Sequence, residues 1–235
     1  MSIPYSSDLL VYWPLNGDLK DASGDASGNG RDLVMHDGGT PMFGPGRYTK
    51  GYALEYRKGI PERAWYNQSI PCTSDLTVSA WAYAGSLDNA AMLWTLYSTY
   101  PIDLFFISND GDDNGFYINT GDSYGNPFTA VNGYSFSGTL LKRYIGRWTH
   151  FTVVFQTGQS VKLYISGKHA GTSKSPVSIP DNLWYVILGA YHISDINDNW
   201  YHWNGRISDF AIYNRALSDA EVENLYNSQG GDETV

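Results

Sequence analysis

The chain has 235 residues, of which 42% are hydrophobic and 15% aromatic, and its formal net charge at pH 7 is −9. This charge argues against nucleic-acid phosphates or an anionic membrane surface as the partner, because both repel an acidic protein. No apolar run approaches the roughly 20 residues of a membrane-spanning helix. The first residues carry neither the basic region nor the apolar core of a signal peptide. Cys72 is the single cysteine, which excludes an intrachain disulfide.

Short runs of alternating apolar and polar residues, separated by turn residues, predict β-strands along most of the chain. A hairpin is expected where Thr157-Gly158-Gln159 separates two of these runs. Three tryptophans within strand patterns, Trp13, Trp81 and Trp148, are expected in the core. In chain order, the predicted strands lie within residues 9–15, 33–35, 52–56, 76–83, 92–97, 104–108, 116–120, 148–155, 161–165 and 184–190.

Residues 203–226 close the predicted fold with one more strand and a short helix. Alternation in this strand predicts that Ile207, Asp209, Ala211 and Tyr213 share one face, with Ser208, Phe210 and Ile212 on the other. Neither face is as polar as a surface requires, so we expect both to be covered. Ser218 and Glu221 then have the spacing of a capping box, which predicts a helix of about two turns.

Residues 204–226, NGRISDFAIYNRALSDAEVENLY, resemble the C-terminal signature of the laminin-G-like, concanavalin A-like jelly-roll domains, a family that includes lectins, carbohydrate-binding modules and phage structural proteins. Ser208 stands where the family often has an acid. The resemblance covers about residues 8–226 and implies an all-β antiparallel β-sandwich with one short C-terminal helix. We therefore predict a single domain over residues 1–235, with a core at about 8–226 and a tail at 227–235.

The resemblance also implies a structural calcium ion (Ca²⁺). In this family an aspartate on the last strand and the polar turn after the first strand often share one, and calcium prefers six to eight oxygen ligands. Carried over residue by residue, the expected ligands are Asp21, Asp209, Asp18, Ser23 and Gly28. In the alternative interpretation, Asp21 merely caps a turn and Asp209 accepts hydrogen bonds from backbone amides.

Two inserted segments, 98–146 and 191–203, combine aromatic residues with aspartate, asparagine and histidine. A sugar presents apolar C–H faces ringed by hydroxyls, so a flat ring beside hydrogen-bonding groups suits it. The candidate ligand-binding residues in and beside these segments are Trp200, Tyr201, His202, Asp198, Asn199, Tyr97, Tyr117, Asp110 and Asp112. Alternatively, such rings pack the loops onto the sheets, which is the role we expect for Trp203 and Tyr213.

Glutamate is scarce, and none of the glutamates has the E-x-D-x-x-E spacing that glycan-cleaving relatives use. Asp110 and Asp112 could replace such a pair, but they lie in a glycine-rich loop tip, which is expected to be neither dry nor rigid. We therefore expect a non-catalytic domain. The first hypothesis is a lectin-like domain that binds a cell-surface or polymeric glycan, as part of a phage virion or a secreted adhesin. The second is a virion structural or decoration protein that binds other virion proteins, and an endoglycanase is the third. The expected location is a virion or the extracellular space, with no nucleic-acid partner and no membrane insertion.

Overall fold

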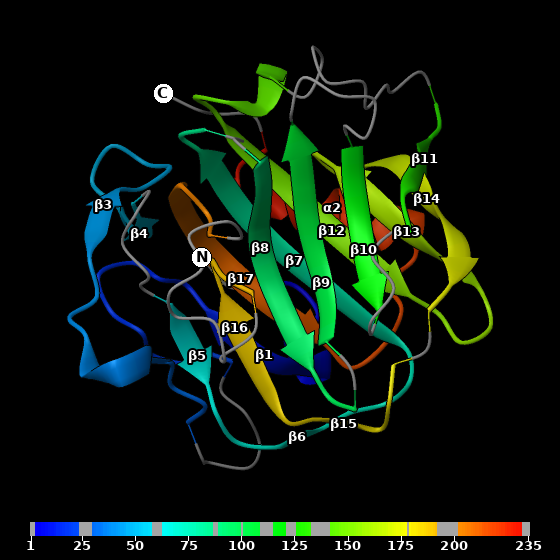
Figure 1. The fold of residues 1–235 in the computed structure, drawn as a ribbon, viewed down its shortest axis with the longest axis horizontal. Helices are drawn as coiled ribbons and strands as arrows, with labels where there is room; N and C mark the ends of the chain where they lie inside the picture. Colours follow the sequence, from blue (N-terminus) through cyan, green and yellow to red (C-terminus); the bar gives the residue numbers. More distant parts are fainter. Residues whose placement is uncertain are drawn as a thin grey trace.

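The structure, a computed structural model, describes residues 3–23, 30–57, 63–86, 89–99, 101–108, 115–120, 126–132, 142–177, 179–191 and 202–231. Within these residues, the strands form a nine-stranded sheet (the large sheet), a six-stranded sheet (the small sheet) and one two-stranded pair, and every pairing between named strands is antiparallel. Figure 1 looks onto the small sheet with the large sheet behind it. The predicted antiparallel sandwich is confirmed.

The large sheet has the order β11 (Phe128–Ala130), β14 (Lys168–Pro176), β13 (Ser160–Ile165), β12 (Trp148–Phe155), β7 (Leu76–Ala84), β17 (Gly205–Tyr213), β4 (Tyr52–Tyr56) and β3 (Phe43–Pro45), while β1 (Leu9–Trp13) pairs with β17. The small sheet has the order β10 (Gly115–Thr120), β9 (Pro101–Ser108), β8 (Asn89–Tyr97), β16 (Tyr185–Leu188), β5 (Ala64–Tyr66) and β2 (Val34–Met35). The pair is β15 (Asn182–Leu183) with β6 (Ile70–Pro71). The helical elements are η1 (Ser6–Asp8), η2 (His36–Gly38), η3 (Lys142–Tyr144) and α2 (Asp219–Ser228).

The main core lies between the two sheets, where the rings of Trp13 and Phe210 stack with centroids 5.3 Å apart. Trp81 is also buried, but its ring lies on the other face of the large sheet, against Tyr226 of α2. The core prediction is wrong for Trp148, which is partly exposed. Trp148 pairs with Tyr83 in the register, and that position faces outward because the alanines on either side of Tyr83 face the core.

The alternation predicted for the closing strand is interrupted by a β-bulge in β17. Asp209 has φ 51°, and the register of β17 on β7 shifts between Ser208 and Ala211. An extra residue in a strand reverses the faces of the residues that follow it. Ile207 therefore lies in the main core with Phe210, not on the face of Ala211, as alternation predicted. The expectation that both faces are covered is confirmed, because the other face packs against α2.

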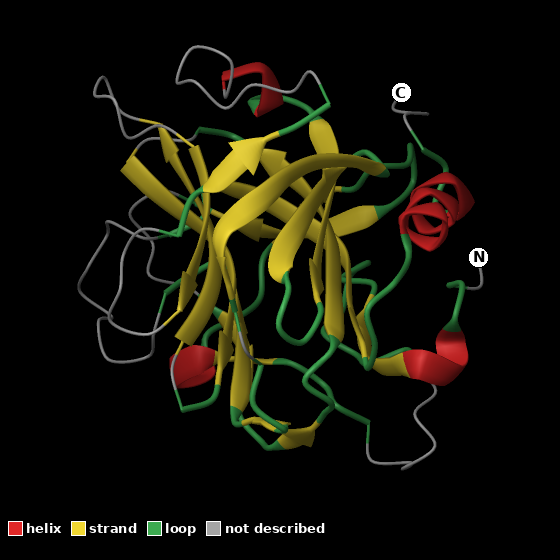
Figure 2. Ribbon diagram, turned by 90° about the vertical axis from the view of Figure 1, so that its right-hand side faces the viewer, coloured by secondary structure: helices red, strands yellow, loops and turns green. Residues whose placement is uncertain are grey.

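The helix α2 covers the outer face of the large sheet, and the N-terminal segment lies beside it (Figure 2). The predicted capping box is confirmed: Ser218 Oγ accepts from the Glu221 N–H, and the Glu221 carboxylate accepts from the Ser218 N–H. The packed chain continues beyond the predicted boundary at Tyr226, since Gln229 is buried. Of the helices in the described ranges, none has the length and apolar character of a membrane span.

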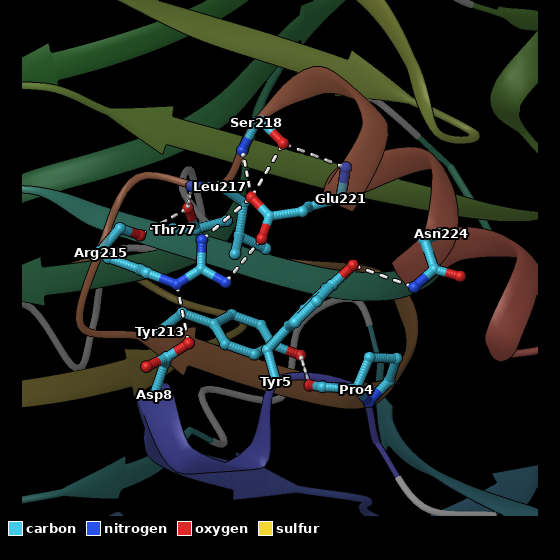
Figure 3. Close-up of polar contacts among 10 residues, drawn as sticks. All are labelled: Pro4, Tyr5, Asp8, Thr77, Tyr213, Arg215, Leu217, Ser218, Glu221 and Asn224. Carbon is cyan, nitrogen blue, oxygen red and sulfur yellow. Dashed lines mark hydrogen bonds and ion pairs between the residues drawn. The ribbon is translucent and has the colours of Figure 1, made fainter.

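Arg215 ties this helix to the N-terminal segment (Figure 3). Its Nε donates to Asp8 at 2.7 Å, and its two terminal nitrogens donate to the Glu221 carboxylate at 3.0 and 2.9 Å. Asn224 of α2 donates to the hydroxyl of Tyr5 at 2.9 Å. Residues near both ends of the described chain are therefore held together on one side of the sandwich.

Replacing Glu221 by glutamine should lower the free energy of unfolding by about 1 kcal/mol near neutral pH, the usual size of a cap or a partly exposed ion pair. Hydrogen bonds from Arg215 and then from the Ser218 N–H lower the pKa of Glu221 to about 2. This stabilisation is present above the unfolded-state pKa of about 4.3 and is lost as the pH falls towards 2. Urea unfolding across this range measures the effect.

The matched control is Glu223→Gln, since Glu223 lies on the same helix and pairs with Lys168 at the exposed surface. This variant should change stability by less than about 0.5 kcal/mol. If the Glu221→Gln variant lost as much unfolding free energy near pH 2 as near neutral pH, the stabilisation would not come from the ionised Glu221 carboxylate.

Candidate functional site

A row of aromatic side chains crosses the outer face of the small sheet. In the register, Tyr185 of β16 lies opposite Tyr97 of β8, and Trp65 of β5 lies opposite Ile187. Their strand neighbours, such as Val186, point into the core and are buried. Because successive side chains point to opposite faces of a strand, Trp65, Tyr97 and Tyr185 share the outer face. The front of Figure 1 shows the strands that carry them.

The rings form a continuous series, which we call the aromatic row. Centroids of neighbouring rings are 5.0 Å apart for His36 and Trp65, 6.2 Å for Trp65 and Tyr185, 4.4 Å for Tyr185 and Tyr97, and 5.8 Å for Tyr97 and Trp184. Tyr97 and Tyr185 are stacked, with 7° between their planes. The backbone N–H of Trp184 donates to the backbone carbonyl of Tyr97 at 2.7 Å, which fixes the end of the row to β8.

The end of the row at Trp184 is open to solvent, since 49% of this residue is exposed. The other end is apolar as well: Val34, which lies opposite Trp65 in the register, is 48% exposed. Burial, and then the neighbouring Tyr97 and its hydrogen bond, raise the pKa of Tyr185 well above its usual range. Its phenol is therefore neutral at physiological pH, and the row presents ring faces and an uncharged hydroxyl.

Only some of the predicted ligand-binding residues lie within the described ranges. Tyr97 belongs to the aromatic row, and Tyr117 lies on the same outer face, on β10. His202 is partly buried and precedes Trp203, which packs in the core against Phe106 at 5.5 Å. The core predictions for Trp203 and Tyr213 are confirmed. Outside the described residues lie Asp198, Asn199, Trp200, Tyr201, Asp110 and Asp112.

Sequence reasoning missed most of the aromatic row. Trp184 and Tyr185 fell within a predicted strand, but nothing in that run indicated which side faces solvent. Strand β5, which carries Trp65, was not predicted at all, because three residues are too few to show a period. The sequence around Trp65 carries no such signal: only the burial of Ala64 and Tyr66 in the structure sets its outward direction.

The turn that was expected to bind calcium meets the closing strand through Tyr12. The Tyr12 N–H donates to Asp21 Oδ1 at 3.0 Å, and its hydroxyl donates to Asp209 Oδ1 at 2.8 Å. Asp21 also accepts from the backbone N–H groups of Ser23, at 3.0 Å, and Arg31, at 3.1 Å. The other oxygen of Asp209 lies 3.2 Å from Arg47 Nη2. The two aspartates are thus linked by one residue, Tyr12, through its backbone N–H and its side-chain hydroxyl.

These contacts do not fit a calcium ion. The Asp209 carboxylate is already paired with a guanidinium, and N–H donors occupy both oxygens of Asp21, as in a capped turn. Asp18 is exposed and accepts from the Lys20 N–H, while the Ser23 hydroxyl donates to Asp21. In the described ranges, no group of three or more histidine, cysteine or acidic residues could hold a metal. Gly28 lies outside these ranges, so the calcium site stays a prediction without support from the described contacts.

Comparisons with known proteins match this chain to a family model and to a curated protein. Residues 63–223, more than half of the chain, match the family described as the concanavalin A-like lectin/glucanases superfamily. Paraclostridial mosquitocidal protein 1 of Paraclostridium bifermentans is 27% identical over 221 residues, which are 87% of this chain and 16% of that protein. The chain thus spans less than a fifth of this curated relative.

Solved structures show the same fold at low sequence identity. Domain 4 of AbnA, a GH43 extracellular arabinanase from Geobacillus stearothermophilus solved with arabinotriose, has TM-score 0.64 and 19% identity, covering 93% of this chain and 98% of that chain. The binding domain of Paraclostridial mosquitocidal protein 1 has TM-score 0.63 and 20% identity, covering 95% and 53%. A structure of botulinum neurotoxin type C, whose cell entry is dependent upon interaction with two ganglioside molecules, has TM-score 0.62 and 14% identity, covering 95% of this chain and 52% of that chain.

Proposed function

Because this chain belongs to the concanavalin A-like lectin/glucanase superfamily, we propose that it is a non-catalytic carbohydrate-binding domain that recognises a cell-surface or polymeric glycan outside the cell. The observation that carries the proposal is the aromatic row. Its rings, with Trp184 half exposed at one end, offer flat apolar surfaces on which the C–H faces of sugars stack. The phenol hydroxyls of Tyr97 and Tyr185 supply hydrogen bonds at the same place.

The length of the row favours an extended glycan over a single sugar. The row crosses β5, β16 and β8, and neighbouring strands lie about 4.8 Å apart, so these three strands alone give it roughly 10 Å. The rings of His36 and Trp184 extend the row further. The rings and hydroxyls of the row provide no carboxylate, so the row itself can hold a sugar without supplying the paired acids that cleave one. Two proteins that share this fold support a carbohydrate partner: AbnA domain 4 was solved in complex with arabinotriose, and cell entry of botulinum neurotoxin type C is dependent upon interaction with two ganglioside molecules.

The other hypotheses gain no support from the described contacts. A location in a virion and binding to other virion proteins stay predictions from the family resemblance. Calcium has no role in the proposed binding, since the row lies away from Asp21 and Asp209, on the small sheet. An extracellular location agrees with the extracellular arabinanase among the structural relatives.

Trp184→Ala should weaken glycan binding at least tenfold, since truncating a tryptophan that carries a binding contact costs about 2 kcal/mol or more, and Trp184 is the most exposed ring of the row. A glycan array first identifies the ligands of the unmodified chain, and isothermal titration calorimetry then compares affinities. The matched control is Trp148→Ala, because Trp148 is also partly exposed but lies on the outer face of the large sheet. Equal binding by the Trp184→Ala variant and the unmodified chain would refute the proposed site.

A further inference from the structure

A concave site lies on the side of the sandwich opposite the aromatic row, where the turn after β1, the loop before β4, the bulge of β17 and the end of α2 meet. It is a cavity of about 490 Å³, a size within the range of about 300–1,000 Å³ that is usual for small-molecule sites. Six of its lining residues give the cavity its chemical character: Tyr12, Arg47, Tyr48, Tyr52, Asp209 and Gln229. Figure 2 shows α2 on the far side of the large sheet from the small sheet, which carries the aromatic row.

Two buried side chains of the lining have unused hydrogen-bonding capacity. Arg47 is 7% exposed and Gln229 is 6% exposed. Arg47 Nη1 donates to the Gln229 carbonyl at 3.0 Å, and Gln229 Oε1 accepts from Trp81 Nε1 at 2.8 Å. Arg47 Nε and Gln229 Nε2 nevertheless have no hydrogen-bond partner within the described part of the chain. Since a buried donor without a partner costs about 1–3 kcal/mol, the floor of the cavity is polar and not fully satisfied by the protein's own hydrogen bonds.

The charges of the lining select a neutral ligand. Arg47 and Asp209 both line the cavity and form an ion pair at 3.2 Å. An anion near Arg47 would also face the Asp209 carboxylate, and like charges about 4 Å apart repel by roughly 4 kcal/mol at the effective dielectric of a protein surface. A cation near Asp209 would meet Arg47 in the same way. Uncharged hydroxyl groups can interact with both residues without this penalty.

The rim of the cavity is aromatic and exposed. Tyr48 is 42% exposed and Tyr52 is 57% exposed, and among the described residues these two, with Val34 and Trp184 of the opposite side, are the exposed large hydrophobic residues. A rim of rings above a floor of hydrogen-bonding groups suits the two kinds of surface that a sugar presents. We propose that this cavity is a second, independent binding site for a neutral mono- or disaccharide, such as the end of a glycan chain.

This inference takes its ligand class from the proposed function, but its site is separate. The aromatic row and the cavity lie on opposite sides of the sandwich, so one sugar cannot contact both. A chain with two such sites would bind a surface of many glycans more tightly than either site alone, because the second contact becomes intramolecular. The cavity would recognise chain ends, and the row would recognise extended stretches.

Ligand-observed NMR on the full chain tests the inference, with a panel of neutral methyl glycosides of glucose, galactose, mannose and arabinose, and with N-acetylneuraminic acid as the anionic comparison. At least one neutral glycoside should bind to the unmodified chain. Tyr52→Ala should weaken that binding at least tenfold, while Trp184→Ala should leave it unchanged. The exposed position of Tyr52 keeps the variant folded, which thermal unfolding verifies.

Three outcomes would overturn the inference. Loss of monosaccharide binding in Trp184→Ala with retention in Tyr52→Ala would leave the proposed function intact and remove the second site. Absence of binding by every neutral glycoside, while the array still detects longer glycans through Trp184, would have the same meaning. Tighter binding of N-acetylneuraminic acid than of the neutral glycosides, dependent on Tyr52, would contradict the neutral ligand class.

Discussion

Replacing Asp209 by asparagine should lower the free energy of unfolding by about 2–3 kcal/mol, less than the cost of removing one partner from a fully buried ion pair, because the Asp209 side chain is 18% exposed. The side chain of Arg47 is 4% exposed, and Asp209 is the carboxylate with which it pairs at 3.2 Å. Asparagine keeps an acceptor for the Tyr12 hydroxyl and tolerates the positive φ of this position, so the variant isolates the charge. Thermal unfolding should show a fall in Tm on the order of 10 °C.

A double-mutant cycle provides the control. The double variant Arg47→Met/Asp209→Asn removes the buried guanidinium together with the carboxylate that pairs with it. Its loss of unfolding free energy should therefore be clearly smaller than the sum of the losses in the two single variants. Asp18→Asn, at an exposed position of the opening turn, should change stability by less than about 0.5 kcal/mol. Strict additivity of the single variants would contradict a direct pair, and a Tm of the unmodified chain that falls with a chelator would indicate a cation at this turn.

The second large effect is a loss of stability in mild acid that depends on His150. This residue is fully buried between the large sheet and α2, with Nε2 2.8 Å from Ser79 Oγ and its ring against Trp81 and Tyr226. Burial, and then the charge of Arg47, lower the pKa of His150 to about 3. The folded protein therefore holds this imidazole neutral at a pH at which the unfolded chain protonates it.

The direction of the effect follows from proton linkage. Below the unfolded-state pKa of about 6.5, the unfolded chain binds the proton and the folded chain does not, so stability falls as the pH falls towards 3. Each pH unit in this window costs up to about 1.4 kcal/mol, or roughly 2–3 kcal/mol between pH 6.5 and 4.5. Urea unfolding at several pH values in this range measures the slope, above the range in which Glu221 contributes.

His150→Gln is the informative variant, since its amide can still hydrogen bond to Ser79 but does not titrate. Its stability should depend less on pH in this window, even where its stability near neutral pH is reduced. Independently, the ring resonances of His150 in the folded chain should show no titration down to about pH 4.5. Titration of this ring near pH 6.5 would refute the buried, neutral state.

Local patterns in the sequence were sufficient for most of the elements. The strand predicted at 148–155 and the capping box of Ser218 and Glu221 coincide with β12 and the start of α2, because alternation and capping depend on residues a few positions apart. Short strands such as β5 were missed because three residues are too few to show an alternating pattern. Strand β14 was missed because KHAGTSKSP is largely polar, and its place in the sheet comes from backbone pairing with β13 and β11 and not from an apolar period.

The sequence by itself determined the antiparallel sandwich, the capped C-terminal helix and the meeting of the opening turn with the closing strand, since these follow from periodicity and from residues that match a family signature. Tertiary structure alone decided which rings face solvent and which charges meet. The bulge at Asp209 turns this carboxylate towards Arg47, 162 positions earlier in the chain. Trp65, Tyr97 and Trp184 become one surface only when three separate stretches of chain meet across the small sheet, and no local pattern encodes such pairing.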